Sequence, residues 1–287
     1  MKLGAHMPIA GGVWTALERG ARLGCEAIQM FVKNNHQWFG PPLTASAQAR
    51  FAAQRAASGL EMVFGHAGYL INLAGPDGPK RDKSIQSLIQ EIQLAAELGL
   101  PFLVLHPGAH LGAGETVGLR RVVVGLDEVL RATAGAPVRL ALENTAGQGT
   151  CLGGQLWHLV EIYQQVEQPD RLGLCLDTAH LFAAGYDIRT ARGWNAVLHQ
   201  IESALGLDQL LAMHLNDSAT ALGSRHDRHA HIGQGHLGRA TFARILNDPR
   251  LSQLPGCLET PKSRDLHEDA VNLAVLRSLR RAVGGKD

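Results

Sequence analysis

Short apolar runs recur along this chain, and most of them end in a side chain that can bind a metal ion or a proton. Continuous apolar segments of this kind are typical of strands in a parallel sheet that is buried on both faces. If such strands close into a barrel, their C-terminal ends meet at one rim, which is where barrel enzymes carry their chemistry. The sequence therefore predicts a ring of His, Asp and Glu side chains at the ends of the runs Lys2–His6, Glu61–His66, Phe102–His106, Val138–Glu143, Leu172–Asp177, Leu211–His214 and Cys257–Glu259.

Strand-like and helix-like segments alternate without a linker between them. Helical periodicity follows the strands, as in the stripe Ile85, Leu88 and Ile92, which we expect Gly99 to end as a C-terminal cap. Eight alternations predict an α/β fold with one domain, a (β/α)8 TIM barrel over residues 1–287, and an open doubly wound sheet is the alternative. We expect the strands near residues 2–6, 26–32, 61–66, 101–106, 138–144, 171–177, 210–216 and 255–260.

Composition narrows the cellular setting. The 287 residues contain no apolar stretch of the roughly 18 residues that a membrane span needs, and we expect no signal peptide, because no such pattern is visible before the first predicted strand. Four cysteines are scattered without a C-x-x-C pair, which favours a reducing cytoplasm. Cys175 and Cys257 lie two residues before Asp177 and Glu259, so strand alternation predicts that both cysteines pack inside the barrel. The net charge of +1 does not by itself suggest a nucleic-acid partner.

Nine candidate ligands suit zinc, which accepts imidazole and carboxylate groups. Any one of them alone is more often a hydrogen-bonded polar residue than a ligand, but their repetition at strand ends makes coincidence improbable. Nine are too many for one ion and suit two or three ions that share a carboxylate. Three zinc ions would outweigh the four carboxylates in charge, so the site should attract a phosphodiester. Without metal, we expect the crowded carboxylates to have raised pKa values or to lower the stability. The candidates are His66, His106, Glu143, Asp177, His180, His214, Asp227, His229 and Glu259.

Several longer stretches resemble endonuclease IV, the family of zinc-dependent apurinic/apyrimidinic endonucleases. The resemblance covers essentially the whole chain in order. It is carried by the stretches at residues 4–6, 69–73 (YLINL), 105–108 (LHPG), 143–149 (ENTAGQG), 173–180 (GLCLDTAH), 182–187 (FAAGYD), 214–217 (HLND), 223–229 (GSRHDRH) and 258–260 (LET).

The resemblance implies a trinuclear zinc centre, with Mn²⁺ as an alternative at one site. One zinc would take His66, His106 and Glu143. The second would share Glu143 and also take Asp177, His214 and Glu259, and the third would take His180, Asp227 and His229. Glu143 and Glu259 would be the catalytic residues. The implied reaction cuts the phosphodiester 5′ to an abasic site in double-stranded DNA and leaves a 3′-hydroxyl and a 5′-deoxyribose phosphate.

The resemblance also implies contacts with bent DNA from which the abasic nucleotide is flipped out. Tyr69 and Leu70 match the family's wedge into the base stack, and His36 stands where the family usually has arginine. Arg225, Arg228 and Lys262 would contact phosphates. The alternatives are a rim aromatic for Tyr69 and solvated surface charges for the arginines.

Two other functions compete with this prediction. A sugar isomerase or epimerase shares the barrel and its metal-binding carboxylates, but it has no evident use for the third ligand group or for Tyr69. A DNA-damage binding protein could instead hold zinc structurally. Endonuclease IV remains the preferred prediction, as a cytoplasmic monomer with no protein partner implied.

Overall fold

Strands form in all eight predicted ranges, and hydrogen bonds join them into a closed parallel barrel. The computed structural model describes residues 1–280. Within that range the barrel order is β1-β10-β7-β6-β5-β4-β3-β2, so the open sheet is excluded and the (β/α)8 prediction is confirmed. The strands are β1 Lys2–His6, β2 Ala27–Phe31, β3 Met62–His66, β4 Phe102–Leu105, β5 Arg139–Glu143, β6 Leu172–Asp177, β7 Leu210–His214 and β10 Pro255–Leu258.

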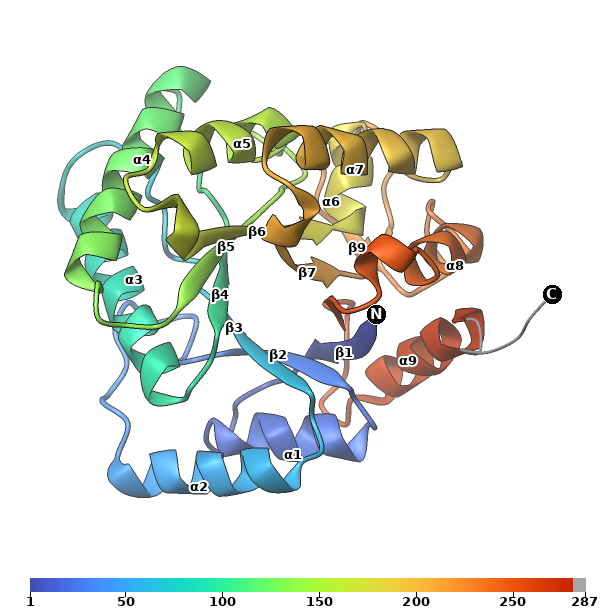
Figure 1. Cartoon of the computed structure of the whole chain (residues 1–287), viewed down its shortest axis with the longest axis horizontal. Coiled ribbons are helices and arrows are strands. Elements are labelled where there is room, and N and C mark those ends of the chain that lie inside the picture. Colours follow the sequence, from blue (N-terminus) through green and yellow to red (C-terminus); the bar gives the residue numbers. More distant parts are fainter. Residues whose placement is uncertain (281–287) are drawn as a thin grey trace.

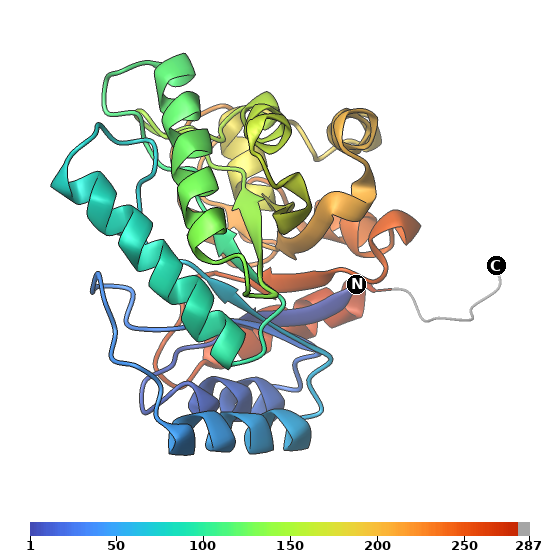
Figure 2. The same ribbon diagram turned by 60° about the vertical axis from the view of Figure 1, so that its left-hand side comes forward.

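Helices surround the barrel (Figure 1), and α9 lies against β1 where the barrel closes. Local sequence explains several helix ends: Thr44 and Thr190 cap α2 and α7 with their hydroxyls, and Gly99 follows α3 with a φ of 65°. Figure 2 shows α3 and α4 side by side along one flank. The helices are α1 Trp14–Arg22, α2 Ala45–Ala57, α3 Pro79–Glu97, α4 Glu115–Ala132, α5 Leu156–Gln165, α6 Thr178–Ala184, α7 Ala191–Ala204, α8 Arg239–Leu246 and α9 His267–Leu279. None of the helices in residues 1–280 is long and apolar enough to cross a membrane.

Apolar side chains pack on both sides of the barrel wall, because alternate residues of each strand point outward and inward. One set faces the helices and forms the large outer core. The other set, which we call the inner cluster, fills the barrel interior, where the rings of Phe64 and Phe102 stack with centroids 4.7 Å apart. Both Cys175 and Cys257 belong to it, fully buried, as predicted. The inner cluster consists of Ala27, Phe64, Phe102, Val104, Ala141, Cys175, Ala212 and Cys257.

The loop after β7 contains structure that the sequence did not predict. Strands β8 (Asp217–Ser218) and β9 (His229–Ala230) pair antiparallel in a two-stranded ribbon outside the barrel. Two residues are too short for a period-two pattern to be read from sequence. The ribbon matters because β9 carries His229 and follows Asp227 closely.

Candidate metal centre

Side chains two residues beyond the inner cluster form a polar ring at the C-terminal mouth of the barrel. Strand alternation produces this arrangement, because residues i and i+2 point to the same side of a strand. Glu143, Asp177 and His214 are fully buried, and His66 is 2% exposed. The ring contains Gln29 and the six predicted ligands His66, His106, Glu143, Asp177, His214 and Glu259. His6 at the end of β1 lies beside it, with Nδ1 3.6 Å from Oε1 of Glu259.

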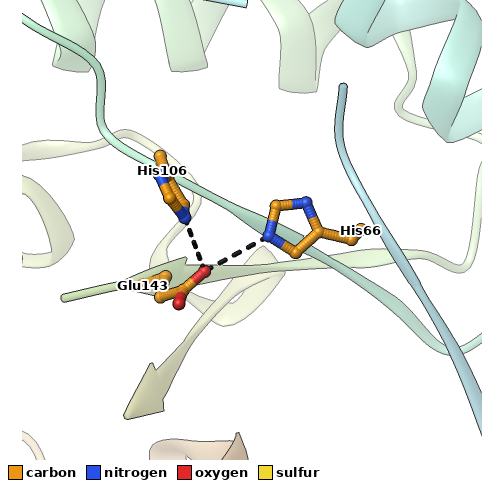
Figure 3. Close-up of side chains that lie close together, drawn as sticks. All are labelled: His66, His106 and Glu143. Atoms are coloured by element: carbon orange, nitrogen blue, oxygen red, sulfur yellow. Dashed lines mark hydrogen bonds and ion pairs between the residues drawn. The ribbon is translucent and has the colours of Figure 1, made fainter. Parts of the chain in front are cut away.

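The first group of ligand atoms comes from His66, His106 and Glu143, as Figure 3 shows. One oxygen of Glu143, Oε2, lies 3.3 Å from Nε2 of His66 and 2.9 Å from Nε2 of His106. His106 is the most open of the three, with about a third of its side chain exposed. The three side chains thus face one point from three consecutive strands.

A second group shares Glu143 and adds Asp177, His214 and Glu259. The other oxygen of Glu143, Oε1, lies 2.8 Å from Nδ1 of His214, and Oε2 of Glu259 lies 3.2 Å from the same nitrogen. The two oxygens of Glu143 therefore face two different groups, which is the geometry of a bridging carboxylate.

The third group lies at the edge of the mouth and uses the loop that carries the ribbon. Asp227 reaches both imidazoles, with Oδ2 3.2 Å from Nε2 of His180 and Oδ1 3.3 Å from Nε2 of His229. Asp177 also lies beside this group, with Oδ2 3.7 Å from Nε2 of His229. Asp177 thus stands between the second and third groups, a sharing that the sequence did not predict.

The donor set fits metal ions, because the histidines are oriented by bonds on their far ring nitrogens. Nδ1 of His66 lies 2.7 Å from the Ala67 carbonyl, and Nδ1 of His229 lies 3.1 Å from the Glu259 carbonyl. If these nitrogens donate, the lone pair of each Nε2 faces carboxylate oxygens, which is repulsive unless a cation or a proton lies between them. Nε2 of His229 is buried and has no hydrogen-bond partner among the described residues. Such orienting bonds are typical of metal-ligating histidines.

Without a metal ion, the imidazoles compensate the carboxylates. Burial would raise the pKa of Glu143, but His214 and His106 hold that pKa well below its ordinary value. Burial likewise opposes ionisation of Glu259, yet His214 and His6 lower its pKa well below the usual range. The expected rise in carboxylate pKa values is therefore wrong for these two residues. Repulsion among the acids is outweighed by attraction to imidazoles that lie within 4 Å of them.

Three buried polar residues of the site were not singled out from the sequence. Gln29 contacts both His214 and Glu259. Asn216 donates to Oδ2 of Asp177 at 2.6 Å and accepts from the backbone of Glu259. Asp217 accepts backbone N–H groups from residues 218, 233, 237 and 238, which joins β8 to the segment that leads into α8. The spacing of Gln29 two residues after Ala27 is the one signal that could have placed it in the ring.

The predicted DNA contacts all lie on the surface around the mouth. Tyr69 is 61% exposed and Leu70 is 39% exposed, and the Tyr69 ring lies 5.7 Å from that of His66. His36, Arg225 and Arg228 are exposed as well. Lys262, which also seemed suited to a phosphate, instead donates to Asp269 and to the His6 carbonyl.

A cavity of about 550 Å³ opens beside the second ligand group. Its lining includes His6, Phe31, Lys33, Tyr69, Glu259 and Lys262. Burial lowers the pKa of His6 to about 4, so this imidazole is neutral at pH 7. The cavity thus joins an exposed aromatic rim to a carboxylate of the ring.

Comparison with known proteins identifies the family. A family model described as a xylose isomerase-like TIM barrel matches residues 17–281. A probable endonuclease 4 from Chloroflexus aggregans is 46% identical over 280 residues, which cover 98% of each chain. A second probable endonuclease 4, from Geobacter sulfurreducens, is 45% identical over 97% of this chain and 94% of that protein.

Solved structures agree with the sequence relatives. The crystal structure of endonuclease IV from Thermus thermophilus superposes with a TM-score of 0.85 at 38% identity, covering 97% of this chain and 98% of that one. A D-tagatose 3-epimerase-like protein superposes with a TM-score of 0.74 at 18% identity, which shows a common fold alone. The resemblance found in the sequence motifs is thereby confirmed, and the chain belongs to the endonuclease IV family of xylose isomerase-like TIM barrels.

Proposed function

We propose that this protein is a zinc-dependent DNA-repair endonuclease that hydrolyses the phosphodiester 5′ to an abasic site. The products would be a 3′-hydroxyl and a 5′-deoxyribose phosphate. The observation that carries the proposal is the set of three ligand groups, linked through Glu143 and Asp177, beside a cavity that is large enough for a small ligand. The relatives named endonuclease 4 support a DNA substrate.

Each ligand group would hold one zinc ion, with Mn²⁺ as an alternative at one of them. His66, His106 and Glu143 would hold the first, and Glu143 would bridge to the second with Asp177, His214 and Glu259. His180, Asp227 and His229 would hold the third. When bound, zinc supplies positive charge for the phosphate and acidifies water at neutral pH.

The protein's own side chains would orient the reaction around these positions. Glu259 lines the cavity and its lowered pKa keeps it ionised, so it can hold the attacking water and accept its proton. Glu143 would fix the position of the first ligand group relative to the second, because one of its oxygens faces each group. His6 and Phe31, which line the same cavity, would help to exclude bulk water from the sugar.

Residues of the rim would select the damaged duplex. Tyr69 and Leu70 would enter the base stack and stabilise the flipped abasic nucleotide, because unstacking costs least where a base is missing. Arg225 and Arg228 would contact phosphates. His36 would fill the gap less completely than arginine, since imidazole is shorter and largely neutral at pH 7. We further propose one domain over residues 1–287, of which 281–287 lie outside the described residues, acting as a cytoplasmic monomer.

Incubation of the zinc-loaded protein with duplexes that carry one abasic site tests the proposal. We expect a nick 5′ to the site, with a 3′ end that a polymerase extends, and little cleavage of the intact duplex. Tight binding without a nick would favour a damage-binding protein, and inertness on DNA with turnover of a ketose would favour an epimerase.

Glu259→Gln tests the placement of the catalytic carboxylate. It should keep the affinity for abasic DNA and lower cleavage by roughly 10²- to 10⁴-fold, the range for loss of a positioned proton acceptor. Glu61→Gln is the matched control, because Glu61 is an exposed glutamate at the opposite end of the barrel, paired with Lys2. Cleavage by Glu259→Gln at the parent rate would show that the role is assigned to the wrong residue.

A further inference from the structure

Gln29 places an amide at the level of the ligand ring, on the one side of the mouth where no ligand was predicted. Its side chain is fully buried on β2. Both N–H groups and the oxygen of its amide face the ring: Nε2 lies 2.6 Å from Oε1 of Glu259 and 2.8 Å from Nδ1 of His6, and Oε1 lies 2.7 Å from Nε2 of His214. A buried amide with such partners is held in one orientation.

The partners determine which end of the amide is nitrogen. A carboxylate oxygen of Glu259 can only accept, so the group that faces it must be the NH₂. Oε1 of Gln29 therefore faces His214 and can only accept a hydrogen bond from the N–H at Nε2 of that ring. The reverse orientation would set two acceptors against each other at 2.6 Å and is excluded.

The bond to His214 has a consequence on the other side of its ring. With a proton kept on Nε2, the lone pair that is free to bind a metal lies on Nδ1. That nitrogen is 2.8 Å from Oε1 of Glu143 and 3.2 Å from Oε2 of Glu259, inside the second ligand group. Gln29 thus fixes the ring form of His214 that directs a ligand atom inward.

The bond to Glu259 gives its two carboxylate oxygens different partners. Oε1 is held by the amide of Gln29, and Oε2 points toward His214 and the second group. One side chain therefore orients two of the predicted ligands of the same ion, from opposite ends of a single amide.

Packing alone does not explain an amide at this position. The residue below it in the strand is Ala27 of the inner cluster, and an aliphatic side chain of similar volume would fill the space. A buried amide costs stability unless every polar atom is paired, so filling the space would favour leucine or methionine. We propose that Gln29 is a positioning residue for the second metal site, formed by Glu143, Asp177, His214 and Glu259. This inference rests on the proposed function, because it assumes that this group binds a metal.

Zinc retention in a Gln29→Leu variant tests the inference without any assay of cleavage. Leucine keeps most of the volume and cannot itself bind zinc. Parent and variant are dialysed against chelators of graded strength, and bound zinc per chain is measured by elemental analysis. Loss of a bond that orients a metal ligand typically lowers metal affinity about 10- to 100-fold. We expect one class of zinc to be lost at a correspondingly weaker chelator strength and the remaining zinc to stay at the parent strength.

Gln209→Leu is the matched control. Gln209 is likewise a glutamine whose amide hydrogen-bonds to two other side chains, accepting from Arg139 and from Tyr163, but it precedes β7 at the opposite end of the strand from His214. This variant should retain zinc like the parent. Thermal unfolding of the metal-free proteins accompanies the titration, and the metal-free Gln29→Leu protein should unfold near the parent temperature.

The outcomes separate the inference from the proposed function. Zinc retention by Gln29→Leu equal to that of the parent would overturn the inference, and so would a uniform loss of all zinc together with a collapse in metal-free stability. A parent protein that binds no zinc would refute the proposed function itself. If Gln29→Leu does not fold, Gln29→Met repeats the test with closer volume, and failure of both to fold would assign Gln29 a structural role.

Discussion

Glu91→Gln should destabilise the folded protein by about 3–5 kcal/mol, because it would leave the ammonium group of Lys33 buried without an opposite charge. The two side chains are 1% and 5% exposed, and Nζ of Lys33 lies 2.8 Å from Oε1 of Glu91. The second oxygen of Glu91 accepts from the Gly68 backbone, and Lys33 also donates to the Gln37 carbonyl. The pair therefore joins the segment before Tyr69 to the segment around His36.

Reference pKa values set the size of the effect. A lysine with an ordinary pKa near 10.4 escapes burial of its charge by losing a proton, which costs about 4.6 kcal/mol at pH 7 and caps the loss. In Lys33→Met the buried Glu91 would take up a proton instead. For a glutamate with an ordinary pKa, protonation costs about 3.7 kcal/mol of free energy at pH 7 but only about 1 kcal/mol at pH 5. Burial already raises the pKa of Glu91 above its ordinary value. Since the folded state then binds the proton more tightly than the unfolded state, the loss in Lys33→Met should grow as the pH rises from 5 to 8.

Urea and thermal unfolding of the parent, both single variants and the double variant, at equal zinc concentration, measure these values. Glu91→Gln should lower the melting temperature by roughly 10 °C, at about 2–4 °C per kcal/mol for a domain of this size. The double variant Lys33→Met/Glu91→Gln should lose less stability than the sum of the two single losses, because no buried charge remains. Strict additivity, or an unchanged melting temperature in Glu91→Gln, would refute the reasoning.

Three further predictions address the rim, the metal and the backbone. Tyr69→Ala should weaken binding to abasic duplex more than to intact duplex in fluorescence anisotropy, whereas Val271→Ala, an exposed residue on α9, should change neither; an unchanged affinity ratio would contradict the wedge. Chelation of zinc should lower the melting temperature in calorimetry while leaving the fold intact, since ligand at about 1,000 times its Kd contributes roughly 4 kcal/mol; a chelator-independent melting curve would argue against a bound metal. Gly108→Ala should destabilise the protein more than Gly112→Ala in urea unfolding. Both glycines have a positive φ, at 101° and 91°, but only at Gly108 would a Cβ collide with Oδ1 of Asn72, so equal losses of stability would rule out the collision as the cause.

The sequence predicts the barrel well because strand runs and helix stripes are local patterns. Each of the eight strands lies where an apolar run was found, and the period of two places ligands such as Asp177 and Glu259 above Cys175 and Cys257. The structure also gathers the nine candidate ligands at one mouth.

Features that depend on distances between remote segments were missed. The position of Asp177 between two groups follows from the path of the loop that carries Asp227, which no local pattern encodes. Gln29 was overlooked because an amide is not among the usual ligands of zinc and its role depends on His214, 185 residues away. The wrong expectation for Glu143 has the same origin, since its pKa depends on imidazoles from other strands.

The inner cluster bears on how such a barrel can diverge. Phe64 and Phe102 occupy neighbouring strands, and the remaining strands carry small residues such as Ala141, Ala212 and Cys257 at this level. Because close-packed interiors tolerate exchanges that conserve total volume far better than single enlargements, the large and small residues should be exchangeable only in compensating pairs. Ala212→Phe without a compensating reduction elsewhere would move the C-terminal end of β7 and displace His214. Substitutions in the inner cluster therefore affect the ligand ring, although no atom of the cluster takes part in the chemistry.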